Sequence, residues 1–334
     1  MTERMPRTIE THGATFTVSD EERYQEYWTS VVEESWEPET FMVLKGLIEP
    51  DSTYVDIGAW IGPTVLYGGQ IAARCITAEP DPTAREALEA NLDLNSSVAA
   101  KTTVSPLCIA ADNGPVTLGA PHEEGGGDSE SSMLCKDGHS TWEVDGVTLE
   151  AFFEQFKIDN CSLLKIDIEG GEALVMPAAV SLLKEQRPHV YLSLHAPLIE
   201  EPRSAIEEIV RSLDTYPFLY SNQGRLITAE VLLRDTNLQR FFEIIATDLT
   251  PAELGEKLAR SSSFQQQATT PQQEELGKIF REAYRRCQSE LEQDPTNERW
   301  LTIHQALKQI TPYLQEPNPE LQQKLIGQLR GIVD

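Results

Sequence analysis

The chain has few cysteines for its length, and none of them are paired in a metal-binding spacing. Its 334 residues include five cysteines, at positions 75, 108, 135, 161 and 287, and no C-x-x-C pair. This odd and scattered set indicates neither a disulfide framework nor a zinc site. It is typical of a reducing compartment, so we expect a cytoplasmic protein.

Basic residues and long apolar runs are also scarce. The sequence has 27 lysines and arginines against 54 aspartates and glutamates, which gives a net charge of -27. Nucleic-acid backbones and anionic membranes recruit basic patches, so we expect neither as a partner. The first ten residues lack an apolar signal core, and no later segment has the apolar length that crosses a bilayer. We therefore expect a soluble protein that acts on a small molecule.

The chain does contain a short strand that runs into a glycine turn, over residues 54–63. Val55 and Ile57 suit a buried strand. Gly58 permits a turn that is closed to ordinary side chains, and Gly62 allows the close approach of a ligand or a packed element. A helix is expected from about residue 64 to 73, with its free N–H groups and positive dipole end facing a bound anionic group.

The spacing of this turn separates two cofactor classes. A dinucleotide site uses G-x-G-x-x-G, whereas Trp60 stands here at the second glycine, where its bulk would obstruct a pyrophosphate. Asp56 fits a ligand with a cationic amino group, and S-adenosylmethionine (SAM) carries both an ammonium and a carboxylate. An ordinary strand-to-helix connection explains the turn equally well at this stage.

Further acidic residues follow the next two strands. Glu79 ends a strand over residues 75–79, where nucleoside-binding α/β folds place the acid that binds the ribose hydroxyls. Asp81 lies two residues later. Another strand is expected over residues 103–110. Asp112, which follows it, either reaches an adenine edge or belongs to an Asp-Asn-Gly turn.

Residues 162–172 form an apolar strand that ends in carboxylates interleaved with glycines. Asp167 and Glu169 should face the same cleft as Glu79, because ligands of doubly wound sheets bind outside the carboxyl ends of the strands. His195 ends the next strand and suits proton transfer near neutral pH, although a lone histidine also serves as a packed structural residue. Carboxylates suit magnesium, but no third ligand is visible, so a metal site is not expected.

Five motifs together resemble the FkbM-type SAM-dependent methyltransferases. They are D-I-G-A-W-I-G-P (56–63), E-P-D-P (79–82), N-L-D-L-N (91–95), V-T-L-E-A-F (147–152) and K-I-D-I-E-G-G-E (165–172). The resemblance covers roughly residues 35–200. It implies the α/β class I methyltransferase fold, in which a doubly wound, seven-stranded and mostly parallel sheet has one antiparallel strand. It also implies O-methylation of a sugar or secondary metabolite, with SAM as the cofactor.

By resemblance, Asp56, Gly58 and Gly62 hold the methionine end of SAM, Glu79 holds the ribose, and Asp167 and Glu169 line the site near the methyl group. Together with the candidates from the strand ends and turns, the residues expected to bind SAM are Asp56, Gly58, Ala59, Trp60, Gly62, Glu79, Asp81, Asp112 and Asp167, and those expected at the reacting hydroxyl are His195, Asp167 and Glu169. Two positions depart from the family pattern. Trp60 stands where many members have a smaller polar residue. Ser193 stands where an acid is expected two residues before His195, which leaves the imidazole without a visible carboxylate to orient it.

The hydrophobic content of 40% is enough for a large core, and composition divides the chain into four parts. We expect an irregular stretch and then helices packing on the core over residues 1–50, a methyltransferase domain over 51–252, a polar linker over 253–272 and a helical region over 273–334. Three apolar stripes in the last part predict three helices, a bundle too small to be stable alone. It should dock on the main domain, on a second copy or on a partner enzyme.

Two other functions remain open from the sequence. The first is a methyltransferase fold that binds SAM or a partner but has lost turnover, for which the serine at position 193 is the hint. The second is a nicotinamide-dependent enzyme on a related fold. Fold alone does not separate these from an active methyltransferase, because function resides in the site.

Overall fold

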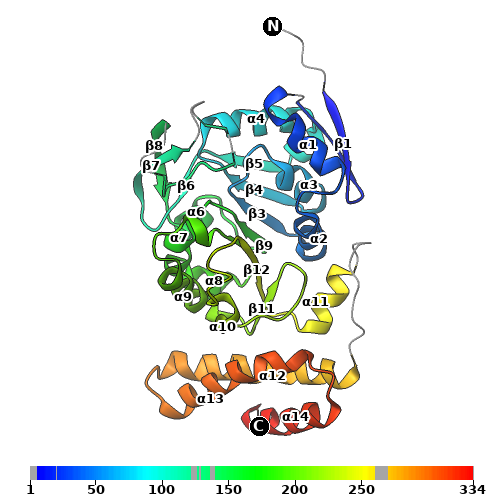
Figure 1. The fold of residues 1–334 in the computed structure, drawn as a ribbon, viewed down its shortest axis with the longest axis vertical. Helices are drawn as coiled ribbons and strands as arrows, with labels where there is room; N and C mark the ends of the chain where they lie inside the picture. Colours follow the sequence, from blue (N-terminus) through cyan, green and yellow to red (C-terminus); the bar gives the residue numbers. More distant parts are fainter. Residues whose placement is uncertain are drawn as a thin grey trace.

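The chain folds around one sheet of seven strands (Figure 1). The computed structural model describes residues 6–19, 21–121, 126–127, 129–135, 140–259 and 270–333. In spatial order the strands are β11 (Phe218–Ser221), β12 (Phe242–Thr247), β10 (His189–Leu194), β9 (Cys161–Ile166), β3 (Thr53–Ile57), β4 (Arg74–Ala78) and β5 (Thr102–Ser105). β12 runs antiparallel to β10 and β11, and the other neighbours pair in parallel. The predicted class I methyltransferase sheet is thereby confirmed.

Alternating residues of the central strands build a hydrophobic layer on each face of this sheet. Tyr54, Leu163 and Tyr191 belong to one buried cluster, whereas Val55 and Leu164 belong to the other. A strand covered on both faces imposes this period of two. The helices of the first layer are α2 (Pro38–Leu47), α3 (Pro63–Ile71), α4 (Pro82–Asp93) and α5 (Ser96–Ala99). Those of the second are α6 (Leu149–Gln155), α7 (Glu172–Ala178), α8 (Val180–Gln186), α9 (Pro202–Ser212) and α10 (Ala229–Leu232).

The N-terminal segment contains a hairpin where irregular chain was expected. β1 (Arg7–Thr11) and β2 (Ala14–Val18) pair in an antiparallel register, and α1 (Gln25–Val32) follows them. Ile9, Phe16 and Val18 are buried in the first cluster, between polar neighbours that are less buried. This short alternation is the signal of a half-buried strand, and the polar composition of the segment obscures it.

The strand expected over residues 103–110 is divided into two. β5 ends at Ser105, and β6 (Cys108–Ile109) pairs instead with β8 (Ser140–Val147). β7 (Gly114–Ala120) completes this separate three-stranded sheet. Pro106 lies at the point of division. Because proline has no N–H group to continue a ladder, the chain leaves the main sheet there.

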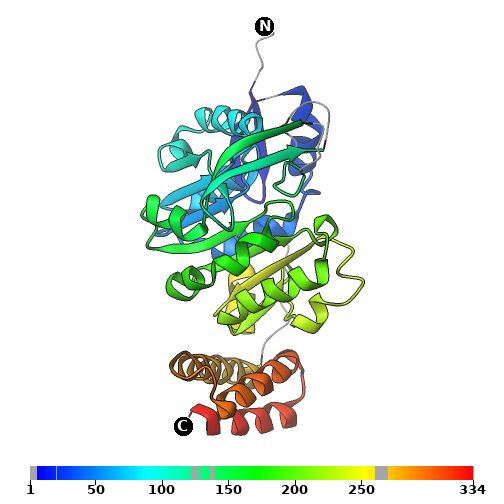
Figure 2. The same cartoon turned by 90° about the vertical axis from the view of Figure 1, so that its left-hand side faces the viewer.

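The C-terminal helices form a separate layer beside the main domain (Figure 2). They are α12 (Pro271–Gln293), α13 (Glu298–Ile310) and α14 (Pro319–Val333), with a 3-10 turn at Thr311–Gln315. α12 packs on the sheet edge, where the ring centroids of Phe280 and Phe218 are 5.5 Å apart. Within the expected linker, residues 253–258 belong to α11 (Pro251–Leu258), and residues 260–269 lie outside the described residues. None of the helices in the described ranges combines the length and apolar character that crossing a bilayer requires.

Candidate active site

The carboxyl ends of β3, β9 and β10 open into a cavity of about 490 Å³, a volume typical of small-molecule sites. Parallel strands end at the same sheet edge, so side chains from distant parts of the sequence meet there. The lining includes Gly58, Ala59, Trp60 and Thr64 from the glycine turn and α3, and Lys165, Asp167, Glu169, Ser193 and His195 from the ends of β9 and β10. The structure therefore brings the two diagnostic stretches of the sequence together.

Two glycines of the turn are required by packing. At Gly58, where φ is 83°, an added Cβ would lie 1.8 Å from the backbone oxygen of Asp167. At Gly62, where φ is 92°, it would lie 2.4 Å from Leu88 Cδ1 on α4. Gly62 does not line the cavity. The sequence left open whether Gly62 approaches a ligand or a packed element, and the structure shows a packed helix.

Asp56 lies beneath the turn and does not line the cavity either. Its side chain is fully buried and accepts hydrogen bonds from Tyr54 Oη at 2.7 Å and Thr64 Oγ1 at 2.6 Å. Its second oxygen lies 3.3 Å from Lys165 Nζ, which also contacts Asp167 at 3.2 Å. Asp56 thus fixes Lys165 and, through it, Asp167. The sequence-based role at the methionine end of SAM has no direct contact to support it.

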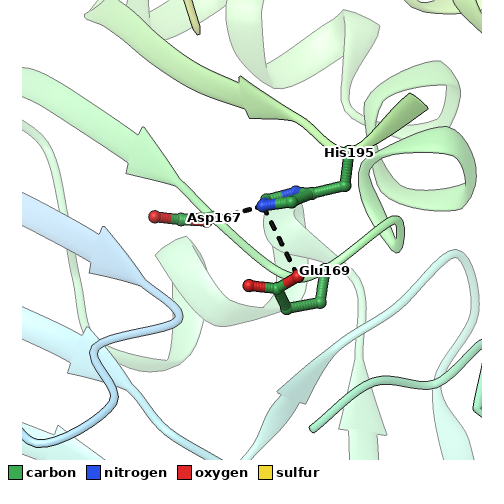
Figure 3. A group of neighbouring side chains, drawn as sticks. All are labelled: Asp167, Glu169 and His195. Carbon is green, nitrogen blue, oxygen red and sulfur yellow. Dashed lines mark ion pairs between the residues drawn. The ribbon is translucent and has the colours of Figure 1, made fainter. Parts of the chain in front are cut away.

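Asp167, Glu169 and His195 converge on one wall of the cavity (Figure 3). His195 Nε2 lies 3.5 Å from Asp167 Oδ1 and 3.5 Å from Glu169 Oε2. The other ring nitrogen, Nδ1, lies 3.0 Å from Oε1 of Glu172, which is completely buried. A carboxylate therefore does orient His195, despite the serine at position 193. Sequence reasoning missed this pairing, although Glu172 closes the K-I-D-I-E-G-G-E motif.

The charges of this cluster shift one another's pKa values. Burial lowers the pKa of His195, but the hydrogen bond to Glu172 and the three nearby carboxylates outweigh burial and raise it to about 9. Burial raises the pKa of Glu169 to about 7, against the opposing effect of His195. Lys165 and His195 hold the pKa of Asp167 below its usual value in spite of its burial. The surrounding carboxylates therefore favour positive charge at the position of His195.

A second and smaller cavity, of about 50 Å³, adjoins the first and is lined by Glu79. The carboxylate of Glu79 accepts the backbone N–H of Trp60 at 2.7 Å and that of Asp81 at 2.9 Å. Burial raises the pKa of Glu79 to about 7, although both hydrogen bonds oppose the shift. Only the backbone of Trp60 contacts Glu79. Its indole ring is held elsewhere, because Nε1 donates to the Gly127 carbonyl at 3.0 Å.

Besides Asp56 and Gly62, two more of the expected SAM residues line neither cavity. Asp81 caps α4, accepting hydrogen bonds from the backbone N–H groups of Thr83 at 2.8 Å and Gly127 at 2.7 Å. Its structural role is a helix N-cap. Asp112 is exposed and lies in a bend before β7. Of the two roles expected for Asp112, contact with an adenine edge or a place in a turn, its position favours the turn.

Other parts of the chain supply the remaining walls. Tyr27, Trp36 and Glu37 come from the N-terminal segment, and Phe241 and Glu243 come from the start of β12. The rings of Tyr27 and Trp60 are 4.5 Å apart and edge to face. These aromatic residues show helical or strand periodicity in the sequence, which marks packing and gives no sign that they also border a cavity.

The family model described as a methyltransferase FkbM domain matches residues 56–223. Among solved structures, a methyltransferase FkbM from Methylobacillus flagellatus is 16% identical, with a TM-score of 0.40 over 67% of this chain and 55% of its own. A proposed SAM-dependent methyltransferase from Streptococcus mutans is 8% identical, with a TM-score of 0.36 over 73% of this chain and 56% of its own. The chain thus spans little more than half the length of these two structures. No curated protein matches it.

The matched region contains both diagnostic stretches. It begins at Asp56 in the glycine turn and includes Asp167, Glu169 and His195, and it extends over half of the 334 residues. With this match, the order of the strands and the convergence of the two stretches agree with the motif resemblance. This protein belongs to the FkbM family of SAM-dependent methyltransferases.

Proposed function

We propose that the protein transfers a methyl group from SAM to a hydroxyl group of a sugar or a secondary metabolite. The observation that carries this proposal is the single cavity of about 490 Å³, which is bordered at one side by Gly58 and Trp60 and at the other by Asp167, Glu169 and His195. A donor on the glycine turn and an acceptor at the cluster would share one enclosed space. Enclosure of both reactants is the main requirement of a direct transfer.

The donor set of the chain fits SAM. The cavity is lined by more carboxylates than basic groups, among them Glu37, Asp167 and Glu169, which suits a ligand with a cationic ammonium and sulfonium. The backbone of Gly58 and Trp60 borders the methionine end, and each oxygen of Glu79 keeps a lone pair that can accept a ribose hydroxyl. The 50 Å³ beside Glu79 holds little more than a water molecule, so seating the nucleoside there requires the lining of this cavity to open.

The chemistry divides between the cofactor and the chain. SAM supplies a methyl group already activated by a positively charged sulfur. The residues around the cavity align the acceptor oxygen with it, and alignment of this kind contributes roughly 7–11 kcal/mol. The acceptor oxygen would form the new C–O bond as the C–S bond breaks, and its proton would leave to a carboxylate of the cluster, Asp167 or Glu169. Removing that proton adds about 10²- to 10⁴-fold in rate.

The rim of the cavity indicates the shape of the acceptor. Phe241 is 57% exposed and Leu198 is 44% exposed, and both line the cavity beside His195. The ring centroids of Phe241 and His195 are 5.1 Å apart. An exposed aromatic ring above polar groups suits an acceptor with one apolar face and a reactive hydroxyl at its edge, as in a pyranose or a polyketide.

Calorimetric titration with S-adenosylhomocysteine tests the cofactor site. We expect binding by the wild type and a 10- to 100-fold loss of affinity in Glu79→Gln, since a hydrogen bond to a charged group contributes about 1.5–3 kcal/mol. Asp112→Asn, an exposed acid outside both cavities, is the matched control and should bind as the wild type does. Urea unfolding of each variant separates lost binding from lost folding. A folded wild type that does not bind the ligand would contradict the proposal.

A second experiment tests the acceptor class. The protein is incubated with SAM labelled with ¹³C in the methyl group and with a panel of sugars, polyols and phenols, and the products are identified by NMR. We expect a methyl ether. A C-methylated phenol would contradict O-methylation, whereas tight cofactor binding without any transfer would favour a protein that has lost turnover.

A further inference from the structure

We propose that Asp167, Glu169 and His195 form a binding site for one divalent transition-metal ion at the wall of the cavity. Each of these residues offers one ligand atom, and the three atoms lie within 4.8 Å of one another. They come from two neighbouring strand ends, β9 and β10, and one side of the group faces the cavity (Figure 3). The sequence showed two carboxylates without a third ligand, and folding supplies that ligand as His195.

The two separations from His195 to the carboxylates match those expected around a shared ion. Nε2 of His195 lies 3.5 Å from an oxygen of Asp167 and 3.5 Å from an oxygen of Glu169. These distances exceed the usual hydrogen-bond length of about 2.7–3.2 Å. Ligands about 2.0–2.2 Å from one ion, at angles between a right angle and the tetrahedral angle, lie roughly 2.9–3.6 Å apart.

Two of the three ligands, His195 and Asp167, are held by a neighbour that leaves one atom directed at the shared space. Nδ1 of His195 is bound by Glu172 at 3.0 Å, so Nε2 faces the carboxylates. Asp167 uses Oδ2 for Lys165 at 3.2 Å, and its Oδ1 faces His195. A buried carboxylate behind a histidine is the arrangement that fixes the tautomer and orientation of metal-binding imidazoles. Glu172 is on this basis a positioning residue.

Charge also favours a cation here. Within this contact network, the four carboxylates of Asp56, Asp167, Glu169 and Glu172 face one lysine, Lys165, and the imidazole of His195, which binds an ion in its neutral form. His195 is 6% exposed and Asp56 and Glu172 are fully buried, so solvent screens the excess negative charge poorly. A divalent cation among the three ligand atoms offsets that excess.

The ligand set selects the kind of ion. Imidazole suits zinc, iron, nickel and copper, and carboxylates suit magnesium, calcium and manganese. One imidazole with two carboxylates therefore fits Mn²⁺, Fe²⁺ or Zn²⁺ better than Mg²⁺. Positions left open toward the cavity are available to an acceptor oxygen. That last role rests on the proposed function, whereas ion binding itself does not.

Manganese alone is the probe for this site. Mn²⁺ is titrated into the full chain and the free ion is followed by its EPR signal, and pulsed EPR then detects nitrogen bound to the ion. We expect one tight ion per chain, with coupling to one imidazole nitrogen. Glu169→Gln and His195→Asn should each weaken binding at least tenfold, and Glu172→Gln should weaken it about 10- to 100-fold. Asp112→Asn, which changes an exposed acid outside both cavities, should leave affinity unchanged.

Several results would overturn the site. They are a wild type that binds no Mn²⁺, an ion without nitrogen coupling, and affinity that is equal in the wild type and the cluster variants. The nitrogen coupling is measured on the wild type, so the proposal stays testable even if a variant does not fold. Weak binding by the acidic surface gives no such coupling. S-adenosylhomocysteine binding is measured separately without metal, so failure of the ion site and failure of the cofactor site are distinguishable.

Discussion

Asp56 stands in the motif where a SAM ligand was expected, yet it is a buried structural charge. It accepts hydrogen bonds from Tyr54 and Thr64 and pairs with Lys165. Removing one partner of a buried pair costs about 3–5 kcal/mol, because the other charge is left uncompensated. Asp167 remains beside Lys165, so we predict that Asp56→Asn lowers the free energy of unfolding by about 3 kcal/mol, measured in urea.

The comparison with Glu79→Gln makes this prediction sharper. If Asp56 acts through folding, its substitution lowers stability more than Glu79→Gln does, and any loss of cofactor affinity follows from unfolding. Asp112→Asn serves as the exposed control with unchanged stability. An Asp56→Asn protein as stable as the wild type that no longer binds S-adenosylhomocysteine would restore Asp56 as a direct ligand.

His189 at the start of β10 gives a prediction on pH. Its Nδ1 lies 2.7 Å from Thr247 Oγ1, and burial, with a smaller effect of Lys257, lowers its pKa to about 4 against the opposing charges of Asp248 and Glu49. Between this pKa and the ordinary value near 6.5, the unfolded chain binds a proton that the folded chain does not. The contribution of His189 to the free energy of unfolding is thus fully present above about pH 6.5, and it is lost as the pH falls toward 4.

The matched variant isolates this contribution from the rest of the acidic chain. Between pH 7 and pH 5 the wild type should lose about 2 kcal/mol more unfolding free energy than His189→Gln, whose amide does not titrate. Urea unfolding at the two pH values measures the difference. Equal losses in the two proteins would show that the folded histidine keeps an ordinary pKa.

At the scale of residues, the sequence predicted positions better than roles. Asp167, Glu169 and His195 were identified because parallel strands end at one edge, a rule that needs no knowledge of side-chain packing. The partnership of Glu172 with His195 could not be predicted, because it depends on how α7 turns back beside β10. The same holds for Gly62, whose close neighbour Leu88 belongs to a helix 26 residues away in the sequence.

Among the elements, the N-terminal hairpin shows what the N-L-D-L-N motif does. Asn95 accepts the backbone N–H of Thr17 at 2.9 Å and donates to its carbonyl at 2.6 Å, and Asn91 accepts the N–H of Ser19 at 2.7 Å. These amides bind the outer edge of β2, which would otherwise expose unpaired backbone groups. The motif therefore joins the hairpin to the end of α4.

We predict that Asn95→Ala loosens the hairpin. The substitution removes two hydrogen bonds to β2, so it should cost about 1–3 kcal/mol in local stability and speed amide exchange at Thr17 by about 5- to 150-fold. Asn160→Ala, which removes one exposed amide contact to the Asp51 carbonyl, is the control and should not alter exchange at Thr17. Hydrogen exchange read by NMR measures both. Unchanged exchange in Asn95→Ala would show that packing of Phe16 alone holds the strand.

The elements of the sheet were largely predictable, and the exceptions have physical causes. Strands such as β3 and β9 are mostly apolar and buried along nearly their whole length, the pattern of a strand covered on both faces. The hairpin β1–β2 and strand β8 alternate polar and apolar residues in polar surroundings, so neither stands out by composition. The division of the expected strand at Pro106 depends on β8 being available as a partner. A pairing between strands 30 or more residues apart cannot be predicted from a local sequence pattern.

At the scale of the whole molecule, the C-terminal helices share the core of the main domain. Leu276, Phe280 and Tyr284 on α12 belong to the same buried cluster as Tyr54 of the central strand β3. Tyr284 also donates to the Asp214 carbonyl at 2.8 Å. The predicted separation of residues 273–334 as a region of its own remains a proposal, and so does their association with a second copy. The shared cluster leads us to propose that they unfold together with the methyltransferase domain.

Phe280→Ala tests that cooperativity. The ring is fully buried and its centroid lies 5.5 Å from that of Phe218 on the edge strand, so its removal should cost about 3–5 kcal/mol. If the tail and the main domain form one cooperative unit, calorimetry should show a single transition in the wild type, and the variant should shift that transition as a whole. Leu301→Ala, at a 41% exposed position on α13, should leave it in place. A tail that melts on its own would instead give a separate transition that Phe280→Ala lowers, while hydrogen exchange in β3 and β9 stays as slow as in the wild type. The cavity lies at the carboxyl ends of β3, β9 and β10, and its lining includes no described residue of the C-terminal helices. S-adenosylhomocysteine should therefore raise the melting temperature of the tail only in the cooperative case.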